Sequence, residues 1–181
     1  AATLLFVLNT LSVRAQNTNN GTNSAIVAGS LNTINAGSTS VAIVAGTQNL
    51  IDGGNNNFIG AGRSNTVLGL GGLNNISVIV AGFGNTNAAG RSVIVGGRFN
   101  TIGNNSRGST ITGGEFNLIQ PISPSVANGV LAATIGGGLS NLVGSNAVSA
   151  VVSGGQFNDA LAPGATVPGG FANEASGTNS F

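Results

Sequence analysis

The sequence predicts an all-β protein, a parallel β-solenoid (β-roll) of about ten short coils. Three observations lead to this prediction. A glycine is followed three residues later by an asparagine ten times, β-branched residues recur at fixed places around that glycine, and only 5% of the 181 residues are charged. Because a repeat of this kind means that each unit buries its apolar face against its neighbours, stacked coils are expected rather than a globular core.

The glycine–asparagine pairs are predicted to be tight turns. Alanine or glycine precedes each of these glycines, and the spacing between successive glycines is irregular. The pairs are Gly29/Asn32, Gly46/Asn49, Gly62/Asn65, Gly72/Asn75, Gly82/Asn85, Gly97/Asn100, Gly114/Asn117, Gly138/Asn141, Gly155/Asn158 and Gly170/Asn173. Glycine and asparagine tolerate the positive φ that tight turns require. We further expect the stacked asparagine amides to bond to one another along the axis.

Two apolar columns flank these turns. Isoleucine or valine stands three residues before the glycine in every unit except one, where Gly69 takes this place. The column five residues after the glycine is broken only at Ser77 and Asn87. Short β-branched segments bounded by Gly, Asn and Ser are typical of strands, and the glycine content excludes helices. Each coil is therefore expected to hold a strand such as residues 92–96, a turn, and a second strand such as residues 101–102.

The irregular spacings predict the domain organisation. Residues 24–181 are expected to form the solenoid, and residues 1–23 an N-terminal docking or strand segment. Pro121 and Pro124 lie in the longest interval between turn glycines and cannot donate to a ladder, so residues 120–129 are expected to form an outward loop, with the next strand beginning near Val130. The coils at Gly72 and Gly82 are expected to be the shortest, with almost no return loop.

The composition argues against an enzyme. The chain has no His or Cys, and its four carboxylates are dispersed at Asp52, Glu115, Asp159 and Glu174. We predict no catalytic residue, no cofactor and no metal site, although Asp159 and Glu174 could stack in adjacent coils. A net charge of +1 predicts no nucleic-acid partner, and no apolar run is as long as the roughly 20 residues that a membrane span requires.

Residues that follow the turn glycine test the register of the coils. Arg98 and Glu115 both come immediately after it, so they should stand one above the other as an inter-coil ion pair. Phe99 and Phe116, two places after the glycine, should stack in the same way, with Phe157 in line two coils on. Such columns favour packing over ligand binding.

An apolar column is also expected on the outside of the rod. Because residues alternate between the two faces of a strand, Val27, Val44, Val80 and Val95 should point outward. Monomers rarely expose a long apolar stripe, and three copies around an axis would bury it. The sequence therefore predicts a homotrimer in which these valines are the candidate interface.

Three segments resemble a known family. SVAIVAG at residues 40–46 and SVIVGG at residues 92–97 resemble the S-V-A-I-G-x-G units of YadA-like heads of trimeric autotransporter adhesins. ATVPGGFANEASG at residues 165–177 resembles the repeats of related bacterial surface proteins. The resemblance covers residues 24–181. It implies a left-handed parallel β-roll, association of three chains along their lengths, and binding to host matrix or other cells.

The leading functional hypothesis is a structural and adhesive fibre at a cell or virion surface, outside the cell. It would act by self-assembly and would present its outer loops to a host-surface or matrix receptor. One alternative is a viral spike, fibre or filament subunit with a purely structural role. Another is an ice- or glycan-binding solenoid, for which the asparagine column and Thr33, Thr66, Thr86 and Thr101 are the candidates. Apolar residues interrupt the threonine array, which favours the structural hypotheses.

Overall fold

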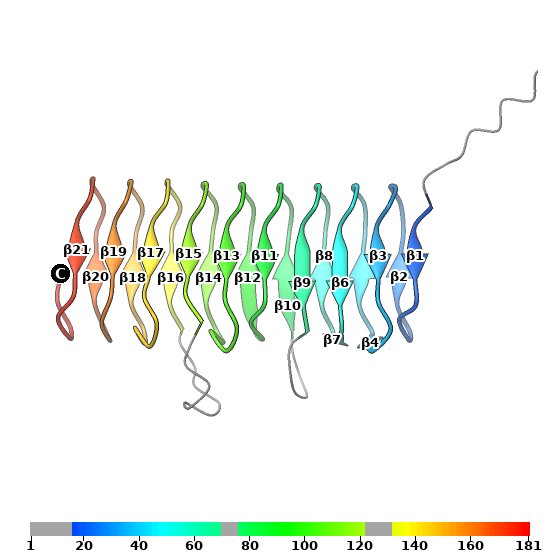
Figure 1. The fold of residues 1–181 in the computed structure, drawn as a ribbon, viewed down its shortest axis with the longest axis horizontal. Coiled ribbons are helices and arrows are strands. Elements are labelled where there is room, and N and C mark those ends of the chain that lie inside the picture. Colours follow the sequence, from blue (N-terminus) through cyan, green and yellow to red (C-terminus); the bar gives the residue numbers. More distant parts are fainter. Residues whose placement is uncertain (1–15, 70–75, 122–131) are drawn as a thin grey trace, which may run out of the picture.

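The computed structural model describes residues 16–69, 76–121 and 132–181. These residues form a rod of coils stacked along one axis, with the strands following in sequence order from one end to the other (Figure 1). The described residues contain strands, turns and bends but no helix. The all-β, parallel solenoid predicted from the repeat is therefore confirmed.

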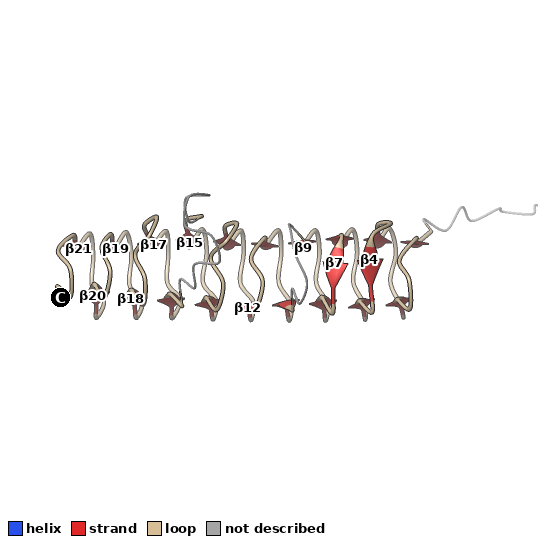
Figure 2. Cartoon of the chain, turned by 90° about the horizontal axis from the view of Figure 1, so that it is seen from below, coloured by secondary structure: helices blue, strands red, loops and turns tan. Residues whose placement is uncertain are grey.

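Two long sheets run the length of the rod. The ten-strand sheet consists of β1 (Thr18–Asn19), β3 (Thr33–Ile34), β6 (Leu50–Asp52), β9 (Thr66–Leu68), β11 (Thr86–Asn87), β13 (Thr101–Ile102), β15 (Leu118–Ile119), β17 (Leu142–Val143), β19 (Asp159–Ala160) and β21 (Glu174–Ala175). The nine-strand sheet consists of β2 (Ala25–Ile26), β5 (Ala42–Ile43), β8 (Phe58–Ile59), β10 (Ser77–Ile79), β12 (Ser92–Ile94), β14 (Thr110–Ile111), β16 (Thr134–Ile135), β18 (Val151–Val152) and β20 (Thr166–Val167). A short third pair, β4 (Ser38–Thr39) and β7 (Gly54–Asn55), lies along the return side (Figure 2).

The register of the sheets places like residues above one another. Every strand pair is parallel and joins neighbouring coils, as in Ile94 with Ile111 and Ile102 with Ile119. The strand–turn–strand unit expected at residues 92–102 is present as β12 and β13. Since strands in a sheet lie about 4.8 Å apart, each coil lengthens the rod by that distance.

The core is a double column of side chains between the two sheets. One residue of most strands points inward and is fully buried, as Ile94, Ile102, Ile111 and Ile119 are. Burial of such a side chain stabilises the fold by about 1.5–3 kcal/mol. A thin coil thus depends on its neighbours, because each inward side chain packs mainly on the coils before and after it.

The prediction of two very short coils at Gly72 and Gly82 is wrong. Ile59 pairs directly with Ile79, and Arg63 pairs with Phe83, so Gly62 and Gly82 belong to turns of neighbouring coils. Gly72 and Asn75 lie outside the described residues. The register therefore leaves no place for a separate coil between these two pairs.

The boundaries of the solenoid also differ from the expected ones. Strand β1 pairs with β3 and belongs to the ten-strand sheet, so regular pairing starts at Thr18 rather than at residue 24. Strand β16 begins at Thr134, beyond the expected start near Val130. Most of the predicted loop at 120–129, and residues 1–15 of the predicted docking segment, lie outside the described residues.

Candidate functional site: the glycine–asparagine turn edge

Each coil passes from the nine-strand sheet to the ten-strand sheet through the glycine–asparagine turn. At Gly97 φ is +88°, and at Phe99 it is +54°. A β-carbon added to Gly97 would lie 2.2 Å from the carbonyl oxygen of Gly114 in the next coil. Two features therefore require glycine at position 97: its backbone conformation and the close approach of the neighbouring turn.

The asparagine of the turn is buried and bonds to the coils on both sides. The Nδ2 of Asn117 donates to Oδ1 of Asn100 at 3.0 Å and to the carbonyls of Gly113 at 3.0 Å and Gly138 at 3.1 Å. Its Oδ1 accepts the backbone N–H of Asn141 at 3.0 Å. The side chain closes its own turn and links three coils, which makes the column a continuous polar ladder within the rod.

The structure brings nine of the ten sequence-predicted asparagines into this ladder. They are Asn32, Asn49, Asn65, Asn85, Asn100, Asn117, Asn141, Asn158 and Asn173. The N–H of Asn85 bonds directly to Oδ1 of Asn65, at 3.1 Å. The ladder also contains Asn17, whose Oδ1 accepts the N–H of Asn32 at 3.0 Å. A search for the motif misses Asn17, because Arg14 stands where the glycine would be.

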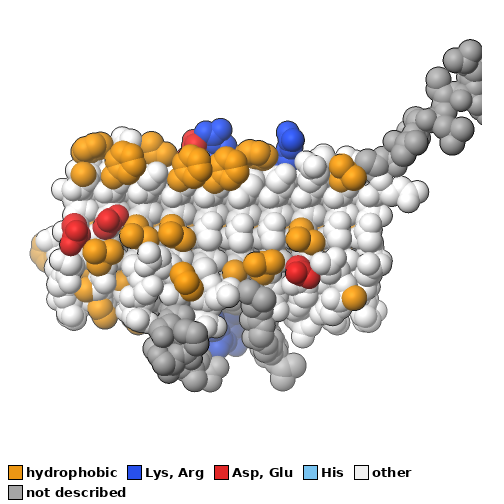
Figure 3. Space-filling model, in the orientation of Figure 1, with side chains coloured by type: hydrophobic (Ala, Val, Ile, Leu, Met, Phe, Trp, Pro, Cys, Tyr) orange, Lys and Arg blue, Asp and Glu red, His pale blue; other side chains and the backbone are white. Residues whose placement is uncertain are grey.

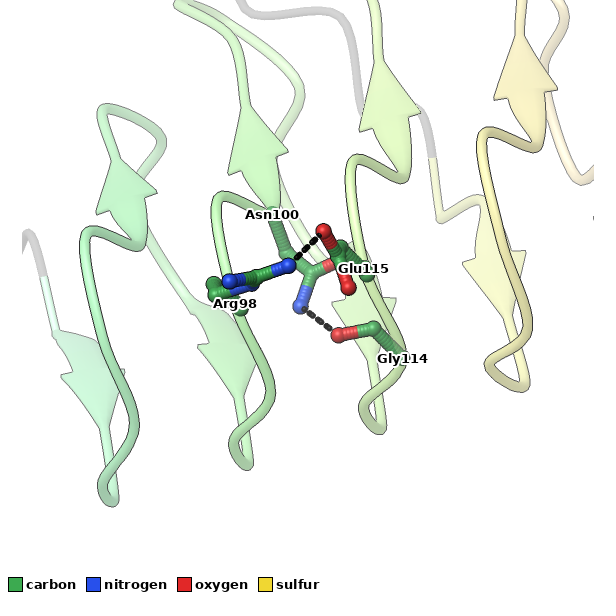
Figure 4. A network of polar contacts seen from close by, with 4 residues as sticks. All are labelled: Arg98, Asn100, Gly114 and Glu115. Atoms are coloured by element: carbon green, nitrogen blue, oxygen red, sulfur yellow. Dashed lines mark hydrogen bonds and ion pairs between the residues drawn. The ribbon is translucent and has the colours of Figure 1, made fainter.

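The apex of the turn carries charged residues in register. Arg98 and Glu115 form a β-bridge with each other, and the Arg98 guanidinium bonds to the Glu115 carboxylate (Figure 4). Their side chains are 53% and 32% exposed. An exposed pair of this kind contributes at most about 1 kcal/mol to stability. The pair therefore marks the register of the coils more than it holds them together.

Phenylalanines continue the same edge. The rings of Phe99 and Phe116 are stacked, with centroids 5.3 Å apart, and Phe83 meets Phe99 edge-on at 5.0 Å. Phe157 forms its edge-on pair with Phe171, at 5.8 Å. Sequence reasoning missed Phe83 and Phe171 because they follow the glycine by one residue rather than two. Figure 3 shows hydrophobic side chains along this upper edge, with basic and acidic groups among them.

The four valines expected to face outward are exposed. The exposed fractions are 70% for Val27, 39% for Val44, 44% for Val80 and 43% for Val95. Gly60 occupies the corresponding place between Val44 and Val80, since Ile43, Ile59 and Ile79 are in register. Beyond Val95 the column continues with Thr112 and then with glycine, serine and proline. The apolar stripe thus covers only the N-terminal part of the rod.

The carboxylates gather in one place only among the described residues. Asp159 and Glu174 are directly in register on the outer face of the ten-strand sheet. Burial, with a smaller contribution from the charge of Glu174, raises the pKa of the Asp159 carboxyl above its ordinary value of 3.8. The Asp159 carboxyl therefore holds its proton more tightly in the folded protein than in the unfolded chain. Within the described ranges, no three His, Cys, Asp or Glu residues lie close enough to hold a metal ion.

This shift gives a testable pH dependence. Since the ionised Asp159 carboxylate disfavours folding at neutral pH, Asp159→Asn is expected to raise the melting temperature there. The gain should fall as the pH drops through the raised pKa and vanish below 3.8, where the carboxyl is protonated in both states. Glu174→Gln removes only the charge of Glu174, which is the smaller cause of the raised pKa of Asp159. This substitution should therefore give a smaller gain in melting temperature. If the melting temperatures of Asp159→Asn and the natural chain differed by the same amount at every pH, the raised pKa of Asp159 would be contradicted.

The fold and the turn edge define a β-solenoid repeat protein whose coils are joined by a buried amide ladder. No family model matches this chain, and no curated protein matches it either. Over the part of the chain that the structure describes, we find no helix with the length and apolar character to cross a membrane.

Proposed function

We propose that this chain is a structural and adhesive segment of a fibre at a cell or virion surface. It acts outside the cell as a left-handed homotrimer and presents its return loops to a host-surface or matrix receptor. One observation carries the proposal: an exposed apolar stripe lies on the N-terminal part of a rod whose buried columns stack one coil on the next. A rod built in this way offers length and a repeated surface, which suits assembly and display.

The valine stripe supports self-association. Val27, Val44, Val80 and Val95 stand on one side of the turn, each at least 39% exposed. Gly60 separates Val44 from Val80, and exposed apolar side chains gathered on one face in this way favour an interaction site. Closed cyclic symmetry buries the same patch on every copy and leaves no open end, so three parallel rods around one axis are favoured over an open sheet.

The experiment is to measure the oligomeric state of the whole chain by sedimentation. We expect a trimer for the natural sequence and a loss of the trimer for the stripe variant, Val44→Ser/Val80→Ser/Val95→Ser. Val148→Ser is the matched control, because Val148 is 43% exposed but lies away from the stripe, in a return turn. A natural chain that sediments as a monomer, or a stripe variant that remains a trimer, would reject this assembly.

A further inference from the structure

The turn edge carries a second apolar surface, which we call the phenylalanine edge. It consists of the residues one and two places after each turn glycine. The first of these columns is Ser30, Thr47, Arg63, Phe83, Arg98, Glu115, Leu139, Gln156 and Phe171. The second column is Leu31, Gln48, Ser64, Gly84, Phe99, Phe116, Ser140, Phe157 and Ala172.

The phenylalanines of the second column are not required by the fold. Phe99, Phe116 and Phe157 adopt φ between +54° and +56°, in a region that bulky L residues rarely occupy. Ser64 and Ser140 adopt the same conformation at the equivalent place in other coils. The three rings are also 37–50% exposed, so they are not needed to fill the core. The rings pack on one another along the edge, and the exposed part of each ring remains open to a partner.

The orientation of the rings restricts what can bind. Phe99 and Phe116 are stacked on each other with an interplanar angle of 13°, and the Arg98 guanidinium lies 5.8 Å from the centre of the Phe99 ring. Phe99 and Phe116 thus each cover one face of the other, and a partner meets the remaining exposed ring surface and the side-chain charges. This geometry places rings and charges in rows along the rod axis. It suits an apolar protein surface with the same axial repeat of about 4.8 Å.

A second copy of this chain has that repeat and also the complementary charges. We propose that two copies pair along their phenylalanine edges in antiparallel orientation, about a two-fold axis between the coils of Gly97 and Gly114. Arg98 of each copy then faces Glu115 of the other, and Phe99 faces Phe116. Because the contact is isologous, every favourable pair occurs twice.

The rest of the edge is mixed in the same alignment, with Phe157 facing Ser64 and Phe171 facing Thr47. One step outward from the axis, Phe83 faces Leu139 of the second copy, and beyond it Arg63 faces Gln156. In a parallel, in-register pair each Arg98 would instead face Arg98, and each Glu115 would face Glu115. Like charges placed opposite each other suppress the wrong arrangement, so the charge order selects the antiparallel one.

The size of the surface predicts a weak dimer. Phe99, Phe116, Phe157 and Phe171 are 37%, 50%, 47% and 66% exposed. With about 150–250 Å² for a whole side chain, they offer about 400 Å² of apolar surface. A standard interface buries about 800 Å² per partner. Self-association should therefore be measured at high protein concentration.

This contact goes beyond the proposed trimer, and the test separates the two. It is made in the stripe variant, in which the valine contact is removed. There we expect a monomer–dimer equilibrium by sedimentation, and at least a tenfold rise in the dissociation constant when Phe99→Ser and Phe116→Ser are added. The matched control is Phe181→Ser, since Phe181 is 97% exposed and lies off the edge. A stripe variant that stays monomeric, or a serine variant that associates as before, overturns the proposal.

The antiparallel orientation of the two copies is tested with introduced cysteines, because the chain has no cysteine of its own. Gln48 of one copy faces Ala172 of the other in the antiparallel pair. We expect a disulfide when Gln48→Cys and Ala172→Cys chains are mixed, and none for either chain alone. A disulfide between two Gln48→Cys chains would show a parallel pair and overturn the proposal.

An exchange of charges also tests the antiparallel alignment. It does not need the serine substitutions, so it can be used even if those prevent folding. Arg98→Glu and Glu115→Arg are each expected to weaken self-association, since each leaves like charges opposite each other. An equimolar mixture should restore it, because the substituted positions then face opposite charges. A mixture that associates no better than either chain alone overturns the proposed alignment.

Discussion

Replacing Gly97 by alanine is expected to destabilise the whole rod by about 2–6 kcal/mol, the sum of two physical effects. An alanine held at a φ of +88° is strained by about 1–3 kcal/mol. Its β-carbon would also lie 2.2 Å from the Gly114 carbonyl oxygen and 2.5 Å from Nδ2 of Asn100. Because backbone atoms of the next coil must move to make room, overpacking adds about 1–3 kcal/mol.

The residue before Gly97 provides a matched control. A β-carbon added to Gly96 meets no atom within 4 Å, and Ala28, Ala45 and Ala81 already stand at this place in other coils. Gly96→Ala is therefore expected to be neutral within about 0.5 kcal/mol. Equilibrium denaturation of the two variants and the natural chain measures the difference. Equal stabilities for Gly96→Ala and Gly97→Ala would show that the turns are not packed as the structure places them.

The sequence predicts the repeating parts of this fold well because each position recurs in many coils. One isoleucine before a turn says little, but the same place is held by Ile or Val in nine units. Since parallel coils put these places above one another, the columns Ile26–Ile43–Ile59 and Ile102–Ile119 follow from the spacing alone. Turn position and the Arg98–Glu115 contact follow in the same way, whereas the strand expected at residues 92–96 is shorter, Ser92–Ile94.

The motif fails where a turn lacks the strands that would support it. The unit of Gly72 has Gly69 in place of the first inward isoleucine and Ser77 in place of the second. A coil without apolar side chains has little to bury, and the sheets pass directly from Ile59 to Ile79. The missing apolar residues were the signal in the sequence that no separate pair of strands stands between Ile59 and Ile79 in the sheet.

Asn87 shows a second limit of the repeat. It occupies the inward place of β11, where other coils carry apolar residues, and it is fully buried. Its Nδ2 donates to the carbonyls of Val78 at 3.2 Å and Ser92 at 3.1 Å, and its Oδ1 accepts the Ser92 hydroxyl at 2.6 Å. The Ser77 hydroxyl bonds to the Ala89 carbonyl beside it. These partners lie in β10, in β12 and in the buried return segment at Ala89, and no column of like residues predicts this arrangement.

The second large effect is expected from removal of an amide in the middle of the ladder. Asn117→Ala leaves the buried N–H of Asn141 without the Oδ1 that accepts it, and leaves the Gly113 carbonyl without its Nδ2 donor. Each unsatisfied group costs about 1–3 kcal/mol, so a loss of about 2–6 kcal/mol is expected for the two. Urea denaturation monitored by far-UV circular dichroism measures this change.

The position of an asparagine in the ladder should determine how much it contributes. Asn173 stands last in the described ladder, is exposed, and donates to the Gly169 carbonyl and to Asn158 Oδ1. Asn173→Ala is therefore expected to cost only about 1 kcal/mol, the value of an ordinary hydrogen bond. The contrast with Asn117→Ala separates a cooperative ladder from a row of independent turns. If the two substitutions cost the same, each turn would be stabilised by its own asparagine alone, and the bonds between coils would add nothing to the stability of the rod.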